Sequence, residues 1–352
     1  MDLKARNVAL VSIVIINYNG KVFLHRCIDS VLQSKFKNFE IIFVDNNSSD
    51  GSADYLKNNF QDDRIAIHKA DKNYGVPGGR NIGFLESRGE FVVFLDNDTE
   101  VDKDWLGQLL EVFQSDEKIA VAQCKLLNFE ERNRFDHAGD YLTPFGFLCE
   151  RSKQGLDRGQ FDNVDEIFSS KGAAMMVRSS IFRGIGMFDS SYFMYLEETD
   201  FCMRVWLAGY KVVFVPKSIV WHAYGTSLKD VNQYYSTYVV RFYGSRNYIS
   251  TLIKNLSLKN LVVILPFHLL GWLVLSLLFL FKGKFKDSYW ILKGIAWNII
   301  NLVPLLKKRV SVQRNTRKVK DSAFFKKVIV SRGISFYLKK ASCYVTGKHF
   351  RE

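Results

Sequence analysis

Asp96 and Asp98 stand two residues apart at the end of the apolar segment FVVFL. Two carboxylates at this spacing in a turn can converge on one hard cation, and Mg²⁺ or Mn²⁺ commonly bridges such carboxylates to substrate phosphates. A lone D-x-D pair is a weak signal, because Asp is also frequent in turns and at helix N-termini. Its place after a strand favours a divalent-metal site. His222, which follows Trp221, is a candidate third ligand, although a lone histidine is more often structural.

Three carboxylates stand close together in the segment Glu197-Glu198-Thr199-Asp200, just before a helical pattern. Acidic residues in a first helical turn ordinarily complement the helix dipole. Here they are denser than capping requires, and the aromatic stretch 192–195 precedes them. A carboxylate against an apolar wall can have a raised pKa and act as a general base. The pattern alone leaves open which of the three would do so.

A glycine-rich stretch, NYGVPGGRNIG, spans residues 73–83. Gly78 and Gly79 would allow close backbone approach, and a helix after them would offer its amides to an anion. The stretch has no G-x-G-x-x-G pattern and follows the third predicted strand, so a dinucleotide site is disfavoured. Two alternatives remain: a loop beside a nucleotide pyrophosphate, or a plain turn leading into a helix.

Strand and helix patterns alternate over the first 127 residues, which predicts an α/β fold with a mostly parallel sheet and helices on both faces. Ligands bind such sheets beyond the carboxyl ends of the strands. Polar residues collect at three of these predicted ends, which finish in Asn17, Asp45 and Asp96. The predicted strands are 11–16, 39–45, 64–68, 90–96 and 119–127, and the predicted helices are 22–32, 50–60, 79–88 and 105–113.

The composition excludes several classes of protein. The 352 residues are 47% hydrophobic with five prolines, which excludes a disordered or collagenous chain. The five cysteines are scattered without a C-x-x-C pair, which disfavours a disulfide framework or zinc knuckle and fits a reducing compartment. The net charge of +13 is concentrated after residue 281, where 18 Lys and Arg face 3 Asp and Glu. The body before it is close to neutral, so nucleic-acid binding is disfavoured.

Two apolar segments mark the C-terminal third of the chain. Residues 261–281 are uncharged and as a helix would span about 31 Å, the thickness of a bilayer core; the alternative is a buried core helix. Residues 289–306 contain Lys293, Asn298 and Asn301, which suit a partly wet helix. The N-terminal apolar run 8–16 is short, ends in turn residues and is interpreted as a strand rather than a signal peptide.

These segments predict membrane association through the C-terminal region. A transmembrane hairpin would place Lys282, Lys284 and Lys286 outside, against the positive-inside tendency. Helices that re-enter or lie in the plane of the inner leaflet avoid this conflict and are slightly favoured over a hairpin. We therefore expect a protein on the cytoplasmic face of the cell membrane, anchored by its C-terminal region.

Four motifs together resemble a known family. The segments VSIVIINYNG, FEIIFVDNNSSDGS, NYGVPGGRNIG and FVVFLDND, in this order, resemble the inverting glycosyltransferases of family 2, which have a GT-A fold. The run from residue 171 to 225 resembles the second half of the rhamnosyltransferase-like and galactofuranosyltransferase-like members, where an aromatic stretch leads into an E-D-x-D-type motif and a Trp-His pair follows. The resemblance covers roughly residues 11–227, about two thirds of the chain.

The resemblance implies roles for individual residues. Asp45 matches the residue that binds the donor nucleoside, and Arg80 and Asn81 match the loop beside the nucleotide.

Asp96 and Asp98 match the metal-binding D-x-D, with His222 completing the site. Glu198 matches the catalytic base, but the family usually has Asp at this position, so Glu197 and Asp200 remain rivals. Asn17, at the first strand end, is added to the expected donor-binding residues together with Asp96.

The expected function is metal-dependent, inverting transfer of a sugar from a nucleotide-sugar donor to a glycan or lipid-linked glycan acceptor, by single displacement with a carboxylate base. The expected architecture is a catalytic domain over residues 1–235, divided into a nucleotide half (1–127) and an acceptor half (128–235), followed by helices and a basic tail over 236–352. A nucleotidyltransferase is the first alternative, because it also uses a D-x-D pair. A nucleic-acid-binding protein is a more remote one.

Overall fold

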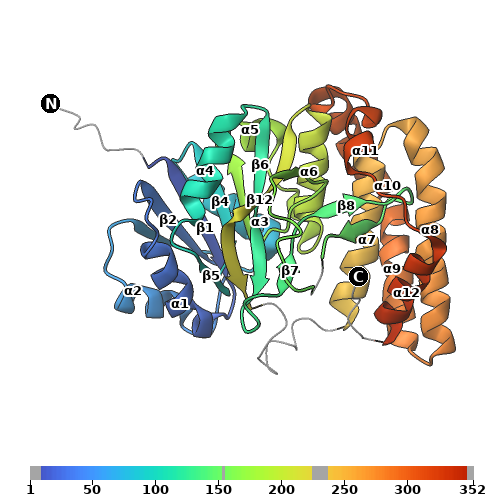
Figure 1. Cartoon of the computed structure of the whole chain (residues 1–352). Helices are drawn as coiled ribbons and strands as arrows, with labels where there is room; N and C mark the ends of the chain where they lie inside the picture. Colours follow the sequence, from blue (N-terminus) through green and yellow to red (C-terminus); the bar gives the residue numbers. More distant parts are fainter. Residues whose placement is uncertain (1–8, 153–154, 224–236, 347–352) are drawn as a thin grey trace.

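A mixed β-sheet forms the centre of the computed structural model, which describes residues 9–152, 155–223 and 237–346 (Figure 1). Among these residues ten strands form one sheet with the order β10-β12-β6-β11-β4-β1-β2-β3, while β5 pairs with β12 and β7 with β6. The strands are β1 (Val11–Asn17), β2 (Phe39–Asp45), β3 (Ile65–Lys69), β4 (Phe91–Asp96), β5 (Thr99–Val101), β6 (Ile119–Asn128), β7 (Phe135–His137), β10 (Asp165–Glu166), β11 (Ala174–Arg178) and β12 (Lys211–His222). A separate hairpin consists of β8 (Asp140–Leu142) and β9 (Leu148–Glu150).

The parallel strands β3, β2, β1 and β4 have registers that align their carboxyl ends. Asn17 of β1 lies opposite Asp45 of β2, and Ile16 lies opposite Asp96 of β4. The apolar runs of β1, β2 and β4 are buried because helices cover both faces of the sheet. This confirms the predicted α/β class and the predicted clustering of polar strand ends. The sheet is mixed, because β11 is antiparallel to both β4 and β6, and the short strands β5, β7 and β10 are also antiparallel to their partners.

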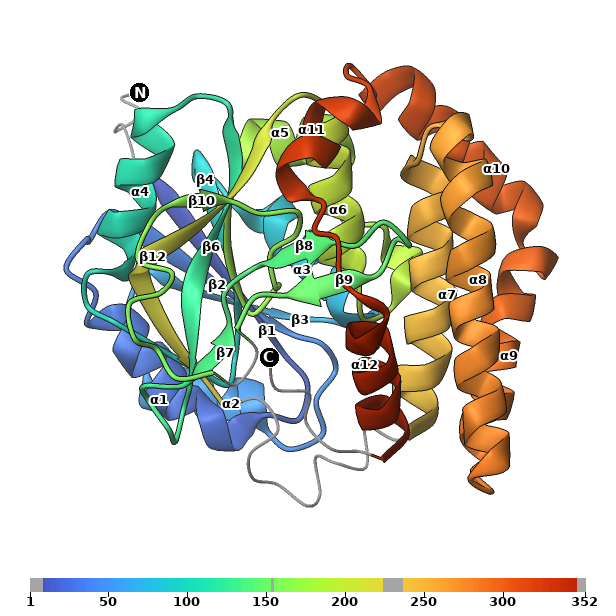
Figure 2. The ribbon, with the colours of Figure 1, turned by 45° about the vertical axis from the view of Figure 1, so that its right-hand side comes forward.

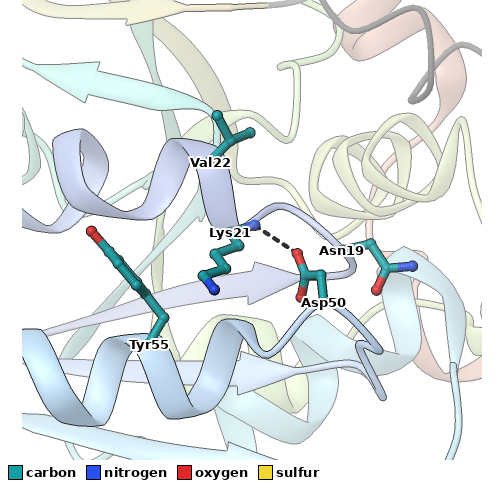
Figure 3. Close-up of a pocket in the computed structure, with 5 residues that line it drawn as sticks. All are labelled: Asn19, Lys21, Val22, Asp50 and Tyr55. Carbon is teal, nitrogen blue, oxygen red and sulfur yellow. Dashed lines mark hydrogen bonds between the residues drawn. The ribbon is translucent and has the colours of Figure 1, made fainter.

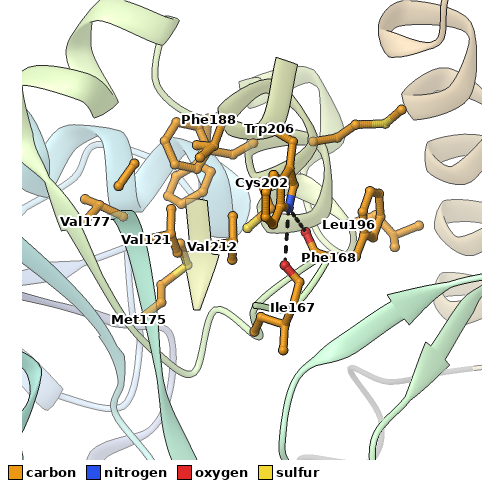
Figure 4. Packing of buried hydrophobic residues seen from close by; sticks show 14 of the residues in the cluster. Val121, Ile167, Phe168, Met175, Val177, Phe188, Leu196, Cys202, Trp206 and Val212 are labelled. Atoms are coloured by element: carbon orange, nitrogen blue, oxygen red, sulfur yellow. Dashed lines mark hydrogen bonds between the residues drawn. The ribbon is translucent and has the colours of Figure 1, made fainter. Parts of the chain in front are cut away.

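Helices cover the two faces of the sheet with separate hydrophobic cores. One core holds Leu24 of α1 and Trp105 of α4, and the other holds Phe84 of α3 and Trp206 of α6. Figure 4 shows the second core, where the Trp206 indole N–H lies 3.2 and 3.1 Å from the carbonyl oxygens of residues 167 and 168. The helices are α1 (Lys21–Leu32), α2 (Ser52–Asn59), α3 (Gly75–Glu86), α4 (Trp105–Ser115), α5 (Ser179–Ile185) and α6 (Glu197–Leu207), with a 3₁₀ turn at Ser190–Tyr192.

The glycine-rich stretch is helical, which corrects the expectation of a loop ahead of a helix at residues 79–88. Helix α3 already begins at Gly75, so Gly78 and Gly79 lie in its first turns. Its glycines permit close packing: a Cβ on Gly83 would lie 2.3 Å from a Val14 methyl carbon on β1. The glycines therefore bring the helix down onto the sheet, where larger residues would hold it away.

The C-terminal third is helical and packs beside the sheet domain. Helices α7, α8 and α9 stand side by side with roughly parallel long axes, and α7 is the one next to α6 (Figures 1 and 2). The helices are α7 (Thr237–Asn255), α8 (Leu258–Phe281), α9 (Phe285–Ile300), α10 (Leu302–Ser311), α11 (Asp321–Val328) and α12 (Ile334–Thr346), with a π-helical turn at Val312–Thr316.

Helix α8 is apolar on all sides but is packed on one side only. Ile264, His268, Trp272 and Ser276, spaced at four-residue intervals, are buried against the protein. The remaining sides expose large apolar side chains: Val262, Val263, Phe267, Leu270, Leu273, Val274, Leu277, Leu278, Leu280 and Phe281. By length and composition this helix could cross a membrane, and α9 with the helix after it could form a second, broken span bent by 66°.

Candidate active site

The two aspartates and the histidine predicted to bind a metal lie together at the end of the sheet. Ligand atoms of Asp96, Asp98 and His222 lie within 4.8 Å of one another. Asp96 ends β4, and the turn after it leads into β5, which pairs antiparallel with the end of β12 so that His222 lies opposite Thr99. Two carboxylates and one imidazole form a donor set that suits a divalent cation such as Mg²⁺ or Mn²⁺.

Asp136 orients the His222 imidazole from the side away from the cluster. The Nδ1 atom of His222 lies 2.9 Å from Asp136 Oδ2, while Nε2 points to Asp98 at 3.3 Å. Burial disfavours the charged imidazole, but Asp98 and Asp136 outweigh it and raise the pKa of His222 to about 10. Asp136 also forms an ion pair with Lys171, whose Nζ atom lies 2.8 Å from Asp136 Oδ2.

Sequence reasoning missed Asp136 and Lys171. Asp136 belongs to no motif, and Lys171 opens the family-like run 171–225, but the resemblance implies no role for it. They reach the site because β7 pairs with β6 and because Lys171 lies just before β11. An ordinary aspartate in a three-residue strand carries no sequence signal of this role. The pairing of the strands is what brings it to the histidine.

Arg80 connects the aspartate pair with the acidic helix start. Its guanidinium lies 2.7 Å from Asp96 Oδ1 and 3.0 Å from Glu197 Oε1, and it donates to the Gly172 carbonyl at 2.8 Å. The side chain is 3% exposed. A Cβ on Gly172 would lie 2.2 Å from a guanidinium nitrogen, so a larger residue there would force Arg80 to move. Arg80 is thus an internal bridge of the site, which corrects its expected position in a loop beside the nucleotide.

Asn81 also lies in α3 and not in a loop. Its amide donates to the Phe188 carbonyl at 2.8 Å and accepts from the Phe188 N–H at 3.1 Å. Both polar atoms of this buried side chain are therefore used in holding the chain before the 3₁₀ turn. The structure thus shows a structural role for Asn81, and its expected contact with a nucleotide stays a prediction.

The three carboxylates of the acidic segment have different surroundings. Asp200 is fully buried and bound by Arg204, Lys254 and Asn255 at 3.0, 3.0 and 2.7 Å. Glu197 is buried and paired with Arg80. Glu198 is partly exposed as a whole, but its Oε2 atom is buried and has no hydrogen-bond partner among the described residues. Burial raises the pKa of Glu198, and Arg80 counteracts this. Glu197 and Asp200 are each held in an ion pair, whereas Glu198 forms no ion pair with the described residues.

Asn17 and Asp45 lie at neighbouring strand ends beside the aspartate pair. Asn17 donates to the Ser48 hydroxyl at 3.0 Å and accepts a hydrogen bond from Asn97. Asp45 accepts the Ser48 N–H at 3.2 Å. These hydrogen bonds hold the turn after β2 against the turn after β1, so both turns border the aspartate pair.

A pocket of about 450 Å³ opens next to these turns, between α1 and α2 (Figure 3). It is lined by Asn19, Lys21, Val22, Asp50 and Tyr55, and the Lys21 N–H donates to Asp50 at 2.9 Å. None of the predicted site residues lines it. The candidate active site is therefore defined by the convergence of charged side chains and not by this pocket.

Comparison with known proteins identifies relatives of the chain. Residues 12–186 match the family model described as Glycosyl transferase family 2. The low-salt glycan biosynthesis hexosyltransferase Agl10 of Haloferax volcanii is 28% identical over 283 residues, which cover 76% of this chain and 84% of that protein. The GalNAc(5)-diNAcBac-PP-undecaprenol beta-1,3-glucosyltransferase of Campylobacter jejuni is 35% identical over 102 residues, covering 28% of this chain and 33% of that one.

A solved structure shares the fold. The mannosyltransferase PcManGT from Pyrobaculum calidifontis, solved in complex with GDP-Man and Mn²⁺, has a TM-score of 0.53 at 13% identity, over 87% of this chain and 86% of that chain. At this identity the likeness shows the fold alone.

The Asp136–His222 contact leads to a prediction about metal affinity. Partners that orient a metal-binding histidine commonly affect affinity 10- to 100-fold. We expect Asp136→Asn to weaken Mn²⁺ binding about 10- to 100-fold, measured by titrating free Mn²⁺ by electron paramagnetic resonance. Asp157→Asn is the matched control, because Asp157 forms a similar 2.8 Å pair with the buried Lys125. Equal affinities in the two variants would contradict the assigned role.

Proposed function

The chain is a family 2 glycosyltransferase, and from this premise we propose that it catalyses metal-dependent, inverting transfer of a sugar from a nucleotide sugar to a glycan or lipid-linked glycan. The observation that carries the proposal is the convergence of Asp96, Asp98 and His222 beside a partly exposed Glu198. Arg80 fixes these two groups relative to each other through Asp96 and Glu197. A cation site and a free carboxylate held at one sheet edge suit a single displacement.

The residues divide the reaction between them. Asp96, Asp98 and His222 would hold the cation, which when bound neutralises charge on the departing diphosphate. The acceptor hydroxyl attacks the anomeric carbon from the face opposite the leaving group, and Glu198 takes the hydroxyl proton. The bond from the anomeric carbon to the phosphate oxygen breaks as the new glycosidic bond forms, so a nucleoside diphosphate leaves. Asn17 and Asp45 lie where the nucleoside would enter this edge.

The domain proposal keeps a catalytic unit over residues 1–235 and a helical unit over 236–352. Residues 1–127 supply the donor side, and 128–235 supply the acidic segment. The second half also supplies His222 to the cluster that Asp96 and Asp98 begin in the first half, and it supplies Asp136 and Lys171 behind that histidine. The two halves of the catalytic domain therefore share one site.

A donor screen tests the function directly. The purified chain is incubated with a panel of TDP-, UDP- and GDP-sugars, with Mn²⁺ or with excess EDTA, and the released nucleotide is identified. We expect nucleoside diphosphate from at least one donor with Mn²⁺ and loss of that activity in EDTA. Full activity in EDTA would contradict metal dependence, and release of pyrophosphate would indicate a nucleotidyltransferase instead.

We predict that Glu198→Gln lowers turnover by about 10²-fold or more, because the amide cannot accept the proton, while the donor KM stays near normal. Glu198 must be ionised to accept the proton, and burial raises its pKa. Wild-type activity should therefore rise with pH over a range that lies above the pKa of an ordinary glutamate. Steady-state kinetics over pH measure both effects.

Glu197→Gln and Asp200→Asn serve as matched controls, since both carboxylates are in buried ion pairs. We expect them to lower thermal stability, because each removes one ion-pair partner of a buried cation. An inactive but stable Glu197→Gln or Asp200→Asn, together with an active Glu198→Gln, would show that the base is misassigned.

The exposed side of α8 supports membrane association. Its apolar side chains are exposed, and so are Ile299 and Ile300 of α9 and Val303 of α10. Water-exposed apolar surfaces of this extent mark interaction sites, and the 18 basic residues after position 281 would favour an anionic leaflet at about 1 kcal/mol for each one near the surface. The related Campylobacter enzyme has a lipid-linked substrate in its name, which fits a lipid-linked acceptor.

The contacts of α8 favour a helix at the membrane surface over a spanning hairpin. Along its length α8 lies beside the protein: Asn260 bonds Asp321, His268 bonds the Phe145 carbonyl, and Lys284 just after it bonds the Val345 carbonyl. A perpendicular crossing would carry α12, with Lys339 and Lys340, into the lipid. We therefore place α8 in the plane of the cytoplasmic leaflet.

Vesicle sedimentation tests this surface. We expect the wild type to sediment with vesicles containing anionic phosphatidylglycerol. We expect the double variant Leu270→Glu, Leu277→Glu to bind about tenfold or more weakly, because it loses two exposed apolar side chains that the lipid would bury. Val22→Glu with Leu85→Glu is the matched control, since both residues are exposed apolar side chains on the catalytic domain. Equal losses in both variants, or no wild-type binding, would contradict the surface.

Labelling a cysteine at position 284 distinguishes the two orientations. Cys343 is replaced by serine first, because the other four cysteines are buried. Labelling from outside the cell would establish the hairpin, and protection from an external reagent supports the in-plane helix.

A further inference from the structure

The segment that leads into the acidic helix has an unusual backbone. Phe193, Tyr195 and Leu196 have φ values of 62°, 66° and 67°, and none of them is glycine. Side chains with a Cβ avoid this region, at a cost of order 1–3 kcal/mol for each residue. Such a conformation persists only when the surroundings enforce it. Residues 192–196, here called the acidic-segment loop, end one position before Glu197 and two before Glu198.

Asn247 of α7 enforces this conformation from one side. Its Nδ2 atom lies 3.2, 2.8 and 2.9 Å from the carbonyl oxygens of Tyr192, Met194 and Tyr195. The side chain is fully buried, and Oδ1 has no hydrogen-bond partner among the described residues. The reverse orientation of the amide would point an oxygen at three carbonyl oxygens. Only an amide nitrogen therefore suits this position.

Helix α3 holds the acidic-segment loop from the other side. The Val76 N–H donates to the Phe193 carbonyl at 2.7 Å. A Cβ on Gly75 would lie 2.2 Å from that same carbonyl oxygen. The loop is thus held between the start of α3, which also carries Arg80, and the middle of α7.

Further contacts join α7 to the residues around the acidic segment. The Tyr192 hydroxyl lies 2.7 Å from the Thr251 hydroxyl, and Asn255 and Lys254 bind Asp200. Helix α7 also packs beside α6 in the fold (Figure 2). The C-terminal helical unit therefore touches the segment that carries the proposed base through side chains of α7.

We propose that Asn247 is a positioning residue for catalysis, which fixes the acidic-segment loop and through it the place of Glu198. This inference rests on the proposed function, because it takes Glu198 as the base. It gives α7 a role in catalysis. This role is separate from the membrane association proposed for α8. Misplacement of a reacting group by about 1 Å can cost on the order of 10²-fold in rate.

The test compares Asn247→Asp with Asn298→Asp in the full-length chain. The first change replaces the amide nitrogen by an oxygen facing three carbonyls. Asn298 is a matched control: it is a buried amide that donates to two helix carbonyls, those of Arg246 and Gly294, and does not touch the acidic-segment loop. Asn247→Ala, which removes the donor without adding repulsion, is the milder second variant.

Two measurements read out the effect. Hydrogen exchange of peptides covering residues 190–200 reports the loop without requiring activity. We expect faster exchange there in Asn247→Asp than in Asn298→Asp, with Asn247→Ala in between. Release of nucleoside diphosphate, from the nucleotide sugar that the donor screen selects, with water as acceptor, should show kcat lowered about 10- to 100-fold in Asn247→Asp while the donor KM stays within twofold of the control.

The outcomes separate this inference from the proposed function. Unchanged exchange and unchanged kcat in both Asn247 variants would overturn the positioning role while leaving the glycosyltransferase reaction intact. Equal losses of kcat and of thermal stability in Asn247→Asp and Asn298→Asp would also overturn it, since they would indicate general destabilisation. A wild type that releases no nucleoside diphosphate from any donor contradicts the proposed function, and the exchange measurement then still decides whether Asn247 holds the loop.

Discussion

The buried guanidinium of Arg80 is the interaction on which the site depends. A charge in the interior is tolerated only when it is paired and hydrogen-bonded, and removal of one partner of a buried ion pair costs about 3–5 kcal/mol. Arg80 meets this condition with Asp96 from β4, Glu197 from α6 and the Gly172 carbonyl ahead of β11. Three segments, the farthest of them 117 positions from Arg80 in the sequence, must therefore meet at its guanidinium. That requirement fixes the cation cluster relative to the acidic segment.

The same constraint explains why Glu198 differs from its neighbours. Glu197 is paired with Arg80, and Asp200 is paired with Arg204 and Lys254, so moving either carboxylate would take a partner away from a buried cation. Glu198 lies between them on the first turn of α6, and its Oε2 atom has no hydrogen-bond partner among the described residues. The two flanking carboxylates secure the helix start, and this frees the middle one for chemistry.

The sequence predicted β1, β2, β3, β4 and β6, the polar strand ends and the cluster of Asp96, Asp98 and His222, because strand patterns and short motifs are local. It misplaced Arg80 and Asn81, since a glycine-rich stretch signals close approach without saying whether a ligand or β1 approaches. It did not indicate Asp136 or Asn247. Their roles arise from partners as far as 86 and 55 positions away, and only the packing of strands and helices brings such partners together.

The C-terminal helical unit has one polar face, which α7 turns to the catalytic domain, and one apolar face, which α8 leaves uncovered. Helix α7 presents amide and charged groups to the catalytic domain, where backbone carbonyls and carboxylates of the acidic segment need partners. Helix α8 leaves apolar side chains uncovered on the side away from the protein. Since α7, α8 and α9 pack on one another through buried residues such as Trp272 and Ile291, a force applied to the apolar side is transmitted to α7. Under the proposed membrane association, a lipid surface that holds α8 would also hold α7, so attachment and catalysis would depend on the same packed helices.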